Sequence, residues 1–183
     1  MNRRGMSMIE LIVAMALLLA IAAVIIPSVA GTRDRDRVLA AAAELEDIMF
    51  AMGDMRSDNQ DWPSRISHLS HPITTADVNI CGSTYPNGKV NNWDGPYLGR
   101  VVPSTGLNIG IGVVQDSLVR QVLAGQNAIM FLEIVDVAEE DAIELNRLLD
   151  ADNSAAAGAV RWTITNAASG LARVQLGRPI KGC

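Results

Sequence analysis

Apolar residues fill the first part of the chain almost without interruption. From Leu11 to Ile26 no residue is charged, and the wider stretch 6–30 would be about 37 Å long as a helix, enough to cross a bilayer core of about 30 Å. Pro27 predicts a kink near its end, because proline removes a backbone donor. We therefore expect a hydrophobic, membrane-spanning helix over residues 6–30.

A second helical pattern follows directly, with no glycine- and serine-rich linker before it. Over residues 31–55 apolar positions recur every three or four residues, and charged positions occupy the other side, which indicates an amphipathic helix with one buried face. The apolar positions are Val38, Ala41, Ala42, Leu45, Ile48, Met49 and Met52. We predict one helix of about 50 residues, or about 75 Å, whose second half packs on a globular domain.

Residues 56–183 predict that domain, built mainly from antiparallel strands. Residues 56–98 are rich in turn signals, and a short helix is expected over 138–152. The strand-like runs are Leu98–Val102, Leu107–Val114, Ile129–Val135, Val160–Thr165 and Ala172–Leu176. Gly106, Gly110 and Gly112 lie in or beside the second run and favour a bulge or close packing there. The predicted fold class is α+β, with a long N-terminal α-helix packed on an antiparallel β-sheet.

The charge and cysteine content narrow the function and the compartment. The net charge is −5, and Lys89 and Lys181 are the only lysines, so the basic surface typical of nucleic-acid binding is not expected. Cys81 and Cys183 allow one internal disulfide, which could stabilise the fold by up to about 4.7 kcal/mol. Such a bond would place the domain outside the cytoplasm, and two unconnected thiols are the alternative.

Glu10 is the one charged residue between Gly5 and Gly31. An ionised side chain in the middle of a bilayer helix costs roughly 2.5–3.5 kcal/mol on insertion scales, so this carboxylate requires a partner. Arg3 and Arg4 form a short basic leader before it, which favours retention of that end on the cytoplasmic side.

A basic leader that ends in Gly5, followed by Met6, Glu10 and an apolar helix, resembles a type IV prepilin. This class comprises the precursors of type IV pilins and of type II secretion pseudopilins, and Pro27 falls where many pilins have a proline. The resemblance implies a pilin-like fold in which residues 1–5 are a leader peptide. A prepilin peptidase would cut after Gly5 and methylate the new amine of Met6, and Glu10 of one subunit would pair with that amine of its neighbour during assembly.

The resemblance further implies a structural subunit and not an enzyme. The chain would first be a single-pass protein of the bacterial inner membrane with a periplasmic head, and would then join an extracellular or periplasmic filament. Its partners would be further copies of itself, an inner-membrane assembly platform, an assembly ATPase and minor pilins. Cell adhesion, motility or DNA uptake would be properties of the filament. The resemblance implies no cofactor.

Two alternatives remain at this stage. The large head and the region bounded by Cys81 and Cys183 favour a pilin, whereas W-D-G-P-Y at residues 93–97 resembles a turn of the major pseudopilin. The second alternative is a secretory signal peptide cut after Ala30, which would release a soluble periplasmic protein.

Other candidate chemistry is weak. His68 and His71 lie in a proline-flanked loop with no second ligand pair close in sequence, and we interpret them as surface histidines. Asp150, Asp152 and Asn153 open like a calcium loop, but Ala155 and Arg161 occupy the positions that need Gly and Glu. Some pseudopilins bind calcium in a C-terminal loop, so a calcium site of another kind is the alternative here. The chain has no nucleophile elbow and no phosphate-binding loop, and we expect no catalytic activity.

Overall fold

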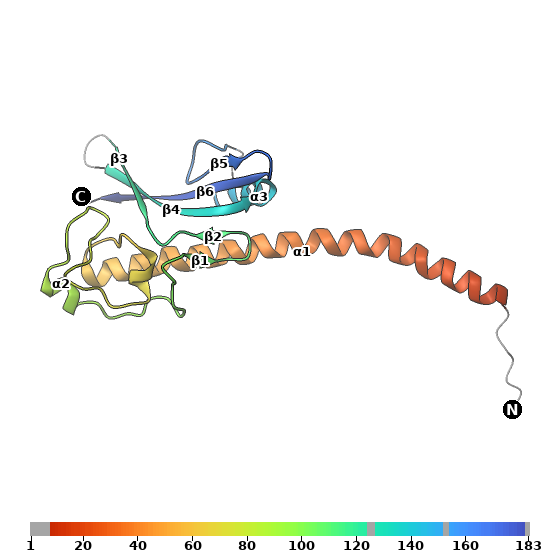
Figure 1. Cartoon of the computed structure of the whole chain (residues 1–183), viewed down its shortest axis with the longest axis horizontal. Coiled ribbons are helices and arrows are strands. Elements are labelled where there is room, and N and C mark those ends of the chain that lie inside the picture. Colours follow the sequence, from red (N-terminus) through yellow and green to blue (C-terminus); the bar gives the residue numbers. More distant parts are fainter. Residues whose placement is uncertain (1–7, 124–126, 152–153, 182–183) are drawn as a thin grey trace, which may run out of the picture. The chain divides into compact units, whose positions relative to one another are not determined.

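One long helix precedes an antiparallel sheet along the chain (Figure 1). The computed structural model describes residues 8–123, 127–151 and 154–181, without the side chains of residues 22 and 24–33. Its elements are α1 (Met8–Asn59), η1 (Ile66–Leu69), α2 (Asn87–Asn91), β1 (Leu107–Asn108), β2 (Val113–Val114), β3 (Val119–Val122), β4 (Asn127–Ala138), α3 (Glu139–Leu149), β5 (Val160–Asn166) and β6 (Leu171–Lys181). The α+β class predicted from the sequence is confirmed.

Helix α1 is 52 residues long, which confirms the prediction of one continuous helix of that size. The chain nevertheless divides into two compact units, Met1–Asp36 and Arg37–Cys183, and α1 contributes to both. We call residues 37–183 the globular unit. The division of the helix at residue 30 into a membrane segment and an amphipathic segment stays a prediction.

Within the described residues the sheet has six strands, and all of their pairings are antiparallel. Its order is β1-β2-β4-β6-β5, and β3 pairs with the first part of β4. The central pair is β4 with β6, in a register that runs from Asn127 opposite Lys181 to Ala138 opposite Leu171. This pairing therefore runs along the full length of β4, and its two ends lie at Asn127 and at Ala138.

The core forms between the second half of α1, the sheet and the loops after α1. Within α1 the buried side chains recur at helical spacing, and along β4 and β6 they alternate, as expected for elements with one face on a core. The buried apolar residues described in α1 are Val38, Ala41, Ala42, Leu45, Ile48, Ala51, Met52 and Met55. They join one hydrophobic cluster with Leu132 and Ile134 of β4 and Val174 of β6, so the amphipathic pattern is confirmed as a packing face.

The predicted strand Leu98–Val102 is wrong, although both of its end residues are buried. The Leu98 N–H donates to the carbonyl oxygen of Leu69 (3.2 Å), and the Val102 N–H donates to Oγ of Ser70 (3.1 Å). Acceptors in the loop around η1 therefore bind the backbone N–H groups that a neighbouring strand would otherwise have bound.

The predicted strand Leu107–Val114 is a tight hairpin instead. β1 and β2 pair with each other, and Gly110 between them has a φ of 85°, which favours glycine. At Gly112 a Cβ atom would lie 2.6 Å from the carbonyl oxygen of Val135 on β4, so only glycine allows this approach. The expectation of close packing is confirmed at Gly106 and Gly112, whereas a Cβ atom at Gly110 would meet no atom closer than 3.8 Å.

Arg37, the first residue of the globular unit, is held by α3. Its Nη2 lies 2.8 Å from Oδ2 and 3.1 Å from Oδ1 of Asp141, whose side chain is buried. A buried carboxylate requires such a partner, because desolvation would otherwise disfavour its charge. The pair fixes α1 against the beginning of α3.

Truncation of the helix–sheet contact should destabilise the globular unit. We expect Leu45→Ala, at a fully buried position, to lower the free energy of unfolding by about 2–5 kcal/mol, through lost burial and a residual cavity. Urea unfolding of the full chain in detergent, followed by tryptophan fluorescence, measures this. The matched control Leu39→Ala, at a position 44% exposed on the same helix, should change it by about 0.5 kcal/mol or less. Equal losses for both variants would contradict the assignment of the buried face.

Candidate functional site

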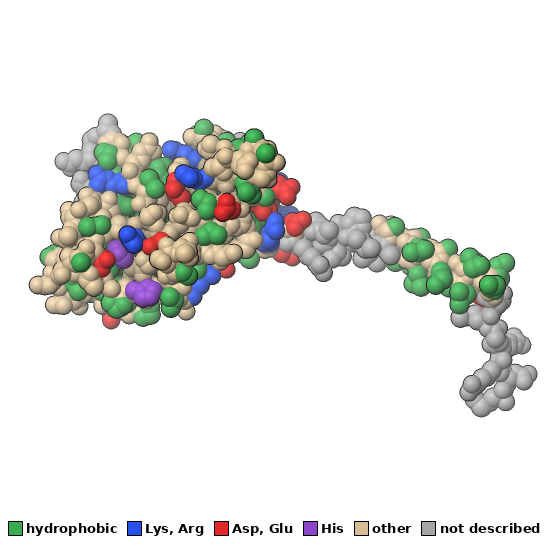
Figure 2. All heavy atoms as spheres, in the orientation of Figure 1, with side chains coloured by type: hydrophobic (Ala, Val, Ile, Leu, Met, Phe, Trp, Pro, Cys, Tyr) green, Lys and Arg blue, Asp and Glu red, His purple; other side chains and the backbone are tan. Residues whose placement is uncertain are grey.

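The first described part of α1 carries apolar side chains on all of its sides. At about 3.6 residues per turn, the apolar positions between Met8 and Ile21 point in every direction around the axis. All are exposed: Met8, Ile9, Leu11, Ile12, Val13, Met15, Leu17, Leu18, Leu19 and Ile21. The green side chains along this segment are visible in Figure 2. So much contiguous apolar surface needs a cover of lipid or protein, since soluble proteins rarely leave such patches in water.

Glu10 lies in the first turn of α1 and is exposed among these apolar side chains. A carboxylate in the first helical turn interacts favourably with the helix dipole. Apolar neighbours on both sides, Ile9 and Leu11, make the surroundings of its charge poor in water wherever the helix is covered. An ionic partner for Glu10 would be favoured wherever this part of the helix is covered, and the assembly role of Glu10 stays a prediction.

For five of the predicted site residues the geometry does not test the predicted role: Gly5, Met6, Pro27, Cys81 and Cys183. Gly5, Met6 and Cys183 lie outside the described residues, so cleavage, methylation and the disulfide stay predictions. Helix α1 continues through Pro27, and the kink there also stays a prediction. Cys81 is half-buried and lines a hollow of the globular unit.

No helix in the described ranges combines the length and the apolar character that a membrane crossing requires.

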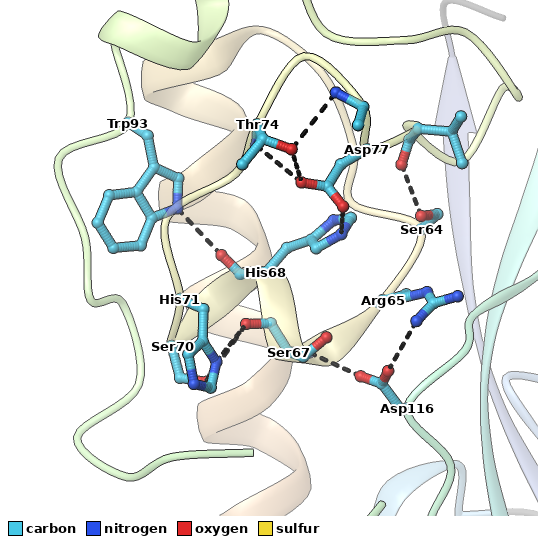
Figure 3. A network of polar contacts seen from close by, with 12 residues as sticks. Ser64, Arg65, Ser67, His68, Ser70, His71, Thr74, Asp77, Trp93 and Asp116 are labelled. Carbon is cyan, nitrogen blue, oxygen red and sulfur yellow. Dashed lines mark hydrogen bonds and ion pairs between the residues drawn. The ribbon is translucent and has the colours of Figure 1, made fainter. Parts of the chain in front are cut away.

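A network of polar side chains orders the loop between α1 and α2 (Figure 3). His68 is buried on η1; its Nε2 lies 3.7 Å from Oδ1 of Asp77, and its backbone oxygen accepts from Nε1 of Trp93 (3.0 Å). Asp116 accepts from the N–H of Ser67 (2.8 Å) and so ties this loop to the segment before β3. Burial lowers the pKa of His68, an effect that the carboxylates of Asp77 and Asp116 partly offset. The prediction of a surface histidine is therefore wrong for His68, whereas His71 is exposed as predicted.

A second cluster, which the sequence did not indicate, lies near the end of α1. The guanidinium carbons of Arg56 and Arg178 are 4.7 and 5.0 Å from the ring centroid of Trp62. These three side chains line a hollow of about 540 Å³ together with Ser57 and Gln60. Arg178 is far from the other two residues in sequence, so no local motif could reveal the cluster. The one available signal was the expectation that the last strand of the sheet packs near α1.

Residues 1–26 match the family model of the prokaryotic N-terminal methylation motif. The chain carries the type IV prepilin signature. No curated protein and no solved structure matches it. This signature is shared by pilins and pseudopilins, and it implies processing by a prepilin peptidase and a structural role in filament assembly.

The signature ends before the globular unit, so the chemistry of that unit rests on its own geometry. In the described part of the chain, no three His, Cys, Asp or Glu side chains are grouped closely enough to hold a metal ion. Of the calcium-like run, Asp152 and Asn153 lie outside the described residues. Oδ2 of Asp150 accepts from the N–H of Val160 (3.1 Å), and this carboxylate thereby closes the connection between α3 and β5.

The W-D-G-P-Y turn is fixed to the end of α1. The hydroxyl of Tyr97 donates to Oδ2 of Asp58 (2.9 Å) and accepts from the N–H of Asp94 (3.1 Å), and the ring of Trp93 packs edge-on against Tyr97. Burial raises the pKa of Tyr97 to about 12, and the contact with Asp58 acts in the same direction. The motif therefore has a structural role in this unit.

The buried imidazole predicts a pH-dependent stability. The unfolded chain protonates His68 near its ordinary pKa of 6.5, whereas the folded chain binds that proton only at lower pH. The free energy of unfolding should therefore fall as the pH drops below 6.5, by at most about 1.4 kcal/mol per pH unit for this one proton. Urea unfolding at about pH 7.5 and about pH 5.0, one above and one below the ordinary pKa of histidine, measures this dependence. His68→Gln should flatten it and His71→Gln, the other histidine, should not; an unchanged slope in His68→Gln would contradict the assignment.

The disulfide predicts a loss of stability on reduction. If Cys81 and Cys183 are joined, Cys81→Ser should lower the free energy of unfolding, by up to about 4.7 kcal/mol in the chain-entropy account. Peptide mapping without reductant tests the bond itself, and unfolding with and without dithiothreitol tests its effect. Two alkylatable thiols in the untreated protein would rule the bond out.

Proposed function

We propose that this protein is a pilin, the structural subunit of a type IV pilus-like filament. Its processing begins with hydrolysis of the Gly5–Met6 peptide bond by a prepilin peptidase, followed by methylation of the new amine. The observation that carries the proposal is the prepilin signature over residues 1–26, joined to a helix whose exposed apolar side chains between Met8 and Ile21 need a cover.

Residues 6–30 would hold the subunit in the bacterial inner membrane, with the globular unit in the periplasm, until assembly. The apolar helix would then exchange a cover of lipid for a cover of neighbouring helices, which are similarly apolar. Within that environment Glu10 of one subunit would pair with the Met6 amine of the next. A desolvated ion pair adds little net stability but specifies register, because any other alignment leaves both charges without partners. The assembly platform, its ATPase and minor pilins are the further partners that such a subunit needs.

A pseudopilin of type II secretion is the second candidate, and the W-D-G-P-Y turn is the observation that favours it. The extent of the globular unit, 37–183, and the two cysteines support the pilin. We propose that the subunit works without a resident cofactor. A loss of stability of the globular unit on addition of a calcium chelator would favour the pseudopilin.

Mass spectrometry of the N-terminus tests the processing. In the full chain produced together with a prepilin peptidase, we expect a mature protein that begins at Met6 and carries one added methyl group. A mature chain that begins at Gly31 would instead establish a signal peptide and overturn the filament proposal, because Glu10 and the apolar helix would then be lost.

Substitution of Glu10 tests the assembly step. We expect Glu10→Ala and Glu10→Gln to leave the protein in the membrane fraction but to lower the yield of sheared filaments about tenfold or more, because the partner amine would be buried alone. The matched control is Glu46→Ala, at an exposed acid of the same helix, which should assemble normally. Filaments of normal abundance from both Glu10 variants would refute the pairing.

A further inference from the structure

Arg56, Trp62 and Arg178 form a preorganised cationic surface, which we call the cradle. Both guanidinium carbons lie within 5.0 Å of one ring centroid, so they are within about 10 Å of each other, which is the Debye length at 0.1 M salt. Cation–π contacts hold both guanidinium groups beside the indole, and Nη1 of Arg178 is further held by the carbonyl oxygen of Met49 (2.9 Å). Two like charges held this close favour a bound anion.

The cradle has donors without acceptors in the described part of the chain. Neither Arg56 nor Arg178 forms an ion pair there, and Nε1 of Trp62, a side chain only 6% exposed, has no hydrogen-bond acceptor. Lys181 adds a third cation, because it lines the adjoining hollow together with Arg56 and Trp62. It forms no ion pair with any residue in the described part of the chain. Exposed Leu123 lies on the same hollow and adds an apolar contact surface.

The opposite arrangement occurs where α3 begins. Glu139 and Glu140 line a hollow of about 420 Å³ with Ile143, whose side chain is 44% exposed. Neither glutamate forms an ion pair in the described ranges, unlike the neighbouring Asp141, which binds Arg37. Both glutamates lie in the first turn of α3, where the helix dipole interacts favourably with acidic side chains. We call this surface the acidic end.

The β4–β6 pair separates the cradle from the acidic end, and Figure 1 shows α3, which carries the acidic end, at one end of this pair. Lys181 is opposite Asn127, at the start of β4, whereas Glu139 directly follows the end of β4. The strand between them has 12 residues, or about 40 Å. The two surfaces therefore cannot satisfy each other within one copy, but they can between two.

We propose that the cradle is a carboxylate-binding site for the acidic end of a second copy of this chain, with Lys181 opposite Glu139 or Glu140. The contact joins different surfaces of the two copies, so each copy keeps one free surface of each kind, and the contact repeats into an open filament unless the rotation between copies closes a ring. This inference rests on the proposed filament function, and it adds a contact between globular units to the contact between apolar helices.

Zero-length carbodiimide cross-linking tests the contact directly, because it joins an amine only to a touching carboxylate. The full chain, prepared as an equal mixture of ¹⁴N- and ¹⁵N-labelled protein, is assembled or concentrated in detergent and then cross-linked. We expect a peptide pair of mixed isotope composition that joins Lys181 to Glu139 or Glu140. The internal positive control is the link within one copy between Lys89 and Asp61, whose Nζ and Oδ2 are 2.6 Å apart.

The outcomes separate this inference from the proposed function. Filaments that form with the Lys89–Asp61 link but without the mixed Lys181 link would overturn the inference and leave the proposed function standing. Absence of filaments, with the mixed link present in concentrated protein, would count against the proposed function and support the contact. A Lys181 link to a carboxylate of another protein, or to another surface of the second copy, would also overturn the inference.

Charge reversal adds a test of the cradle itself. We expect Arg56→Glu to lower the yield of the Lys181 link about tenfold, because it places like charges opposite each other. Combining Arg56→Glu with Glu140→Arg should restore most of the link, now through Glu139. The matched control is Arg173→Glu on exposed Arg173 of β6, which should change nothing. Failure of the combined variant to recover, with its unfolding midpoint unchanged, would overturn the role of the cradle.

Discussion

Burial of one face of α1 is the contact on which the globular unit depends. Residues from Val38 to Met55 supply a stripe of fully or nearly fully buried side chains, and the β4–β6 pair and the loops around η1 close over it. Burial of apolar area is the main favourable term in folding, and here it is concentrated along one helix. Whatever displaces α1 from the sheet therefore removes the core itself.

The same helix meets two different environments. Between Met8 and Ile21 it has apolar side chains on every side, whereas from Arg37 onwards it has one apolar face and one charged face. Only the second pattern can be satisfied within one copy of the chain. The first pattern needs other molecules around it, and the prepilin signature over residues 1–26 agrees with such a requirement.

Local sequence patterns predicted the elements that bury one face along a regular period. Helix α1, strand β4 and helix α3 follow such patterns, and each was placed within a few residues. Where long-range hydrogen bonds decide the conformation, the patterns failed. The backbone N–H of Leu98 donates to the carbonyl oxygen of Leu69 in a loop and not to a neighbouring strand. Strand β3 is short and has mostly exposed side chains, so its sequence shows little alternation of apolar and polar residues.

The candidate site divides in the same way. Glu10 was predictable, because a charge inside an apolar run is visible in the sequence alone. The cradle was not, since Arg56 and Arg178 come together only through the register of β6 against β4 and the docking of both on α1. Burial of His68 likewise depends on Tyr85, whose ring packs edge-on against it from a separate loop.

The bond between Arg37 and Asp141 also has a mechanical consequence. A tensile load carried along α1 would enter the globular unit at Arg37, its first residue. Part of it would pass into α3 through the contact with Asp141, in which Nη2 of Arg37 donates to both carboxylate oxygens. From α3 the load would reach β4, which ends where the helix begins, and then the whole β4–β6 ladder. The backbone hydrogen bonds of this ladder would therefore carry part of the force, and the side-chain packing of α1 would carry the rest.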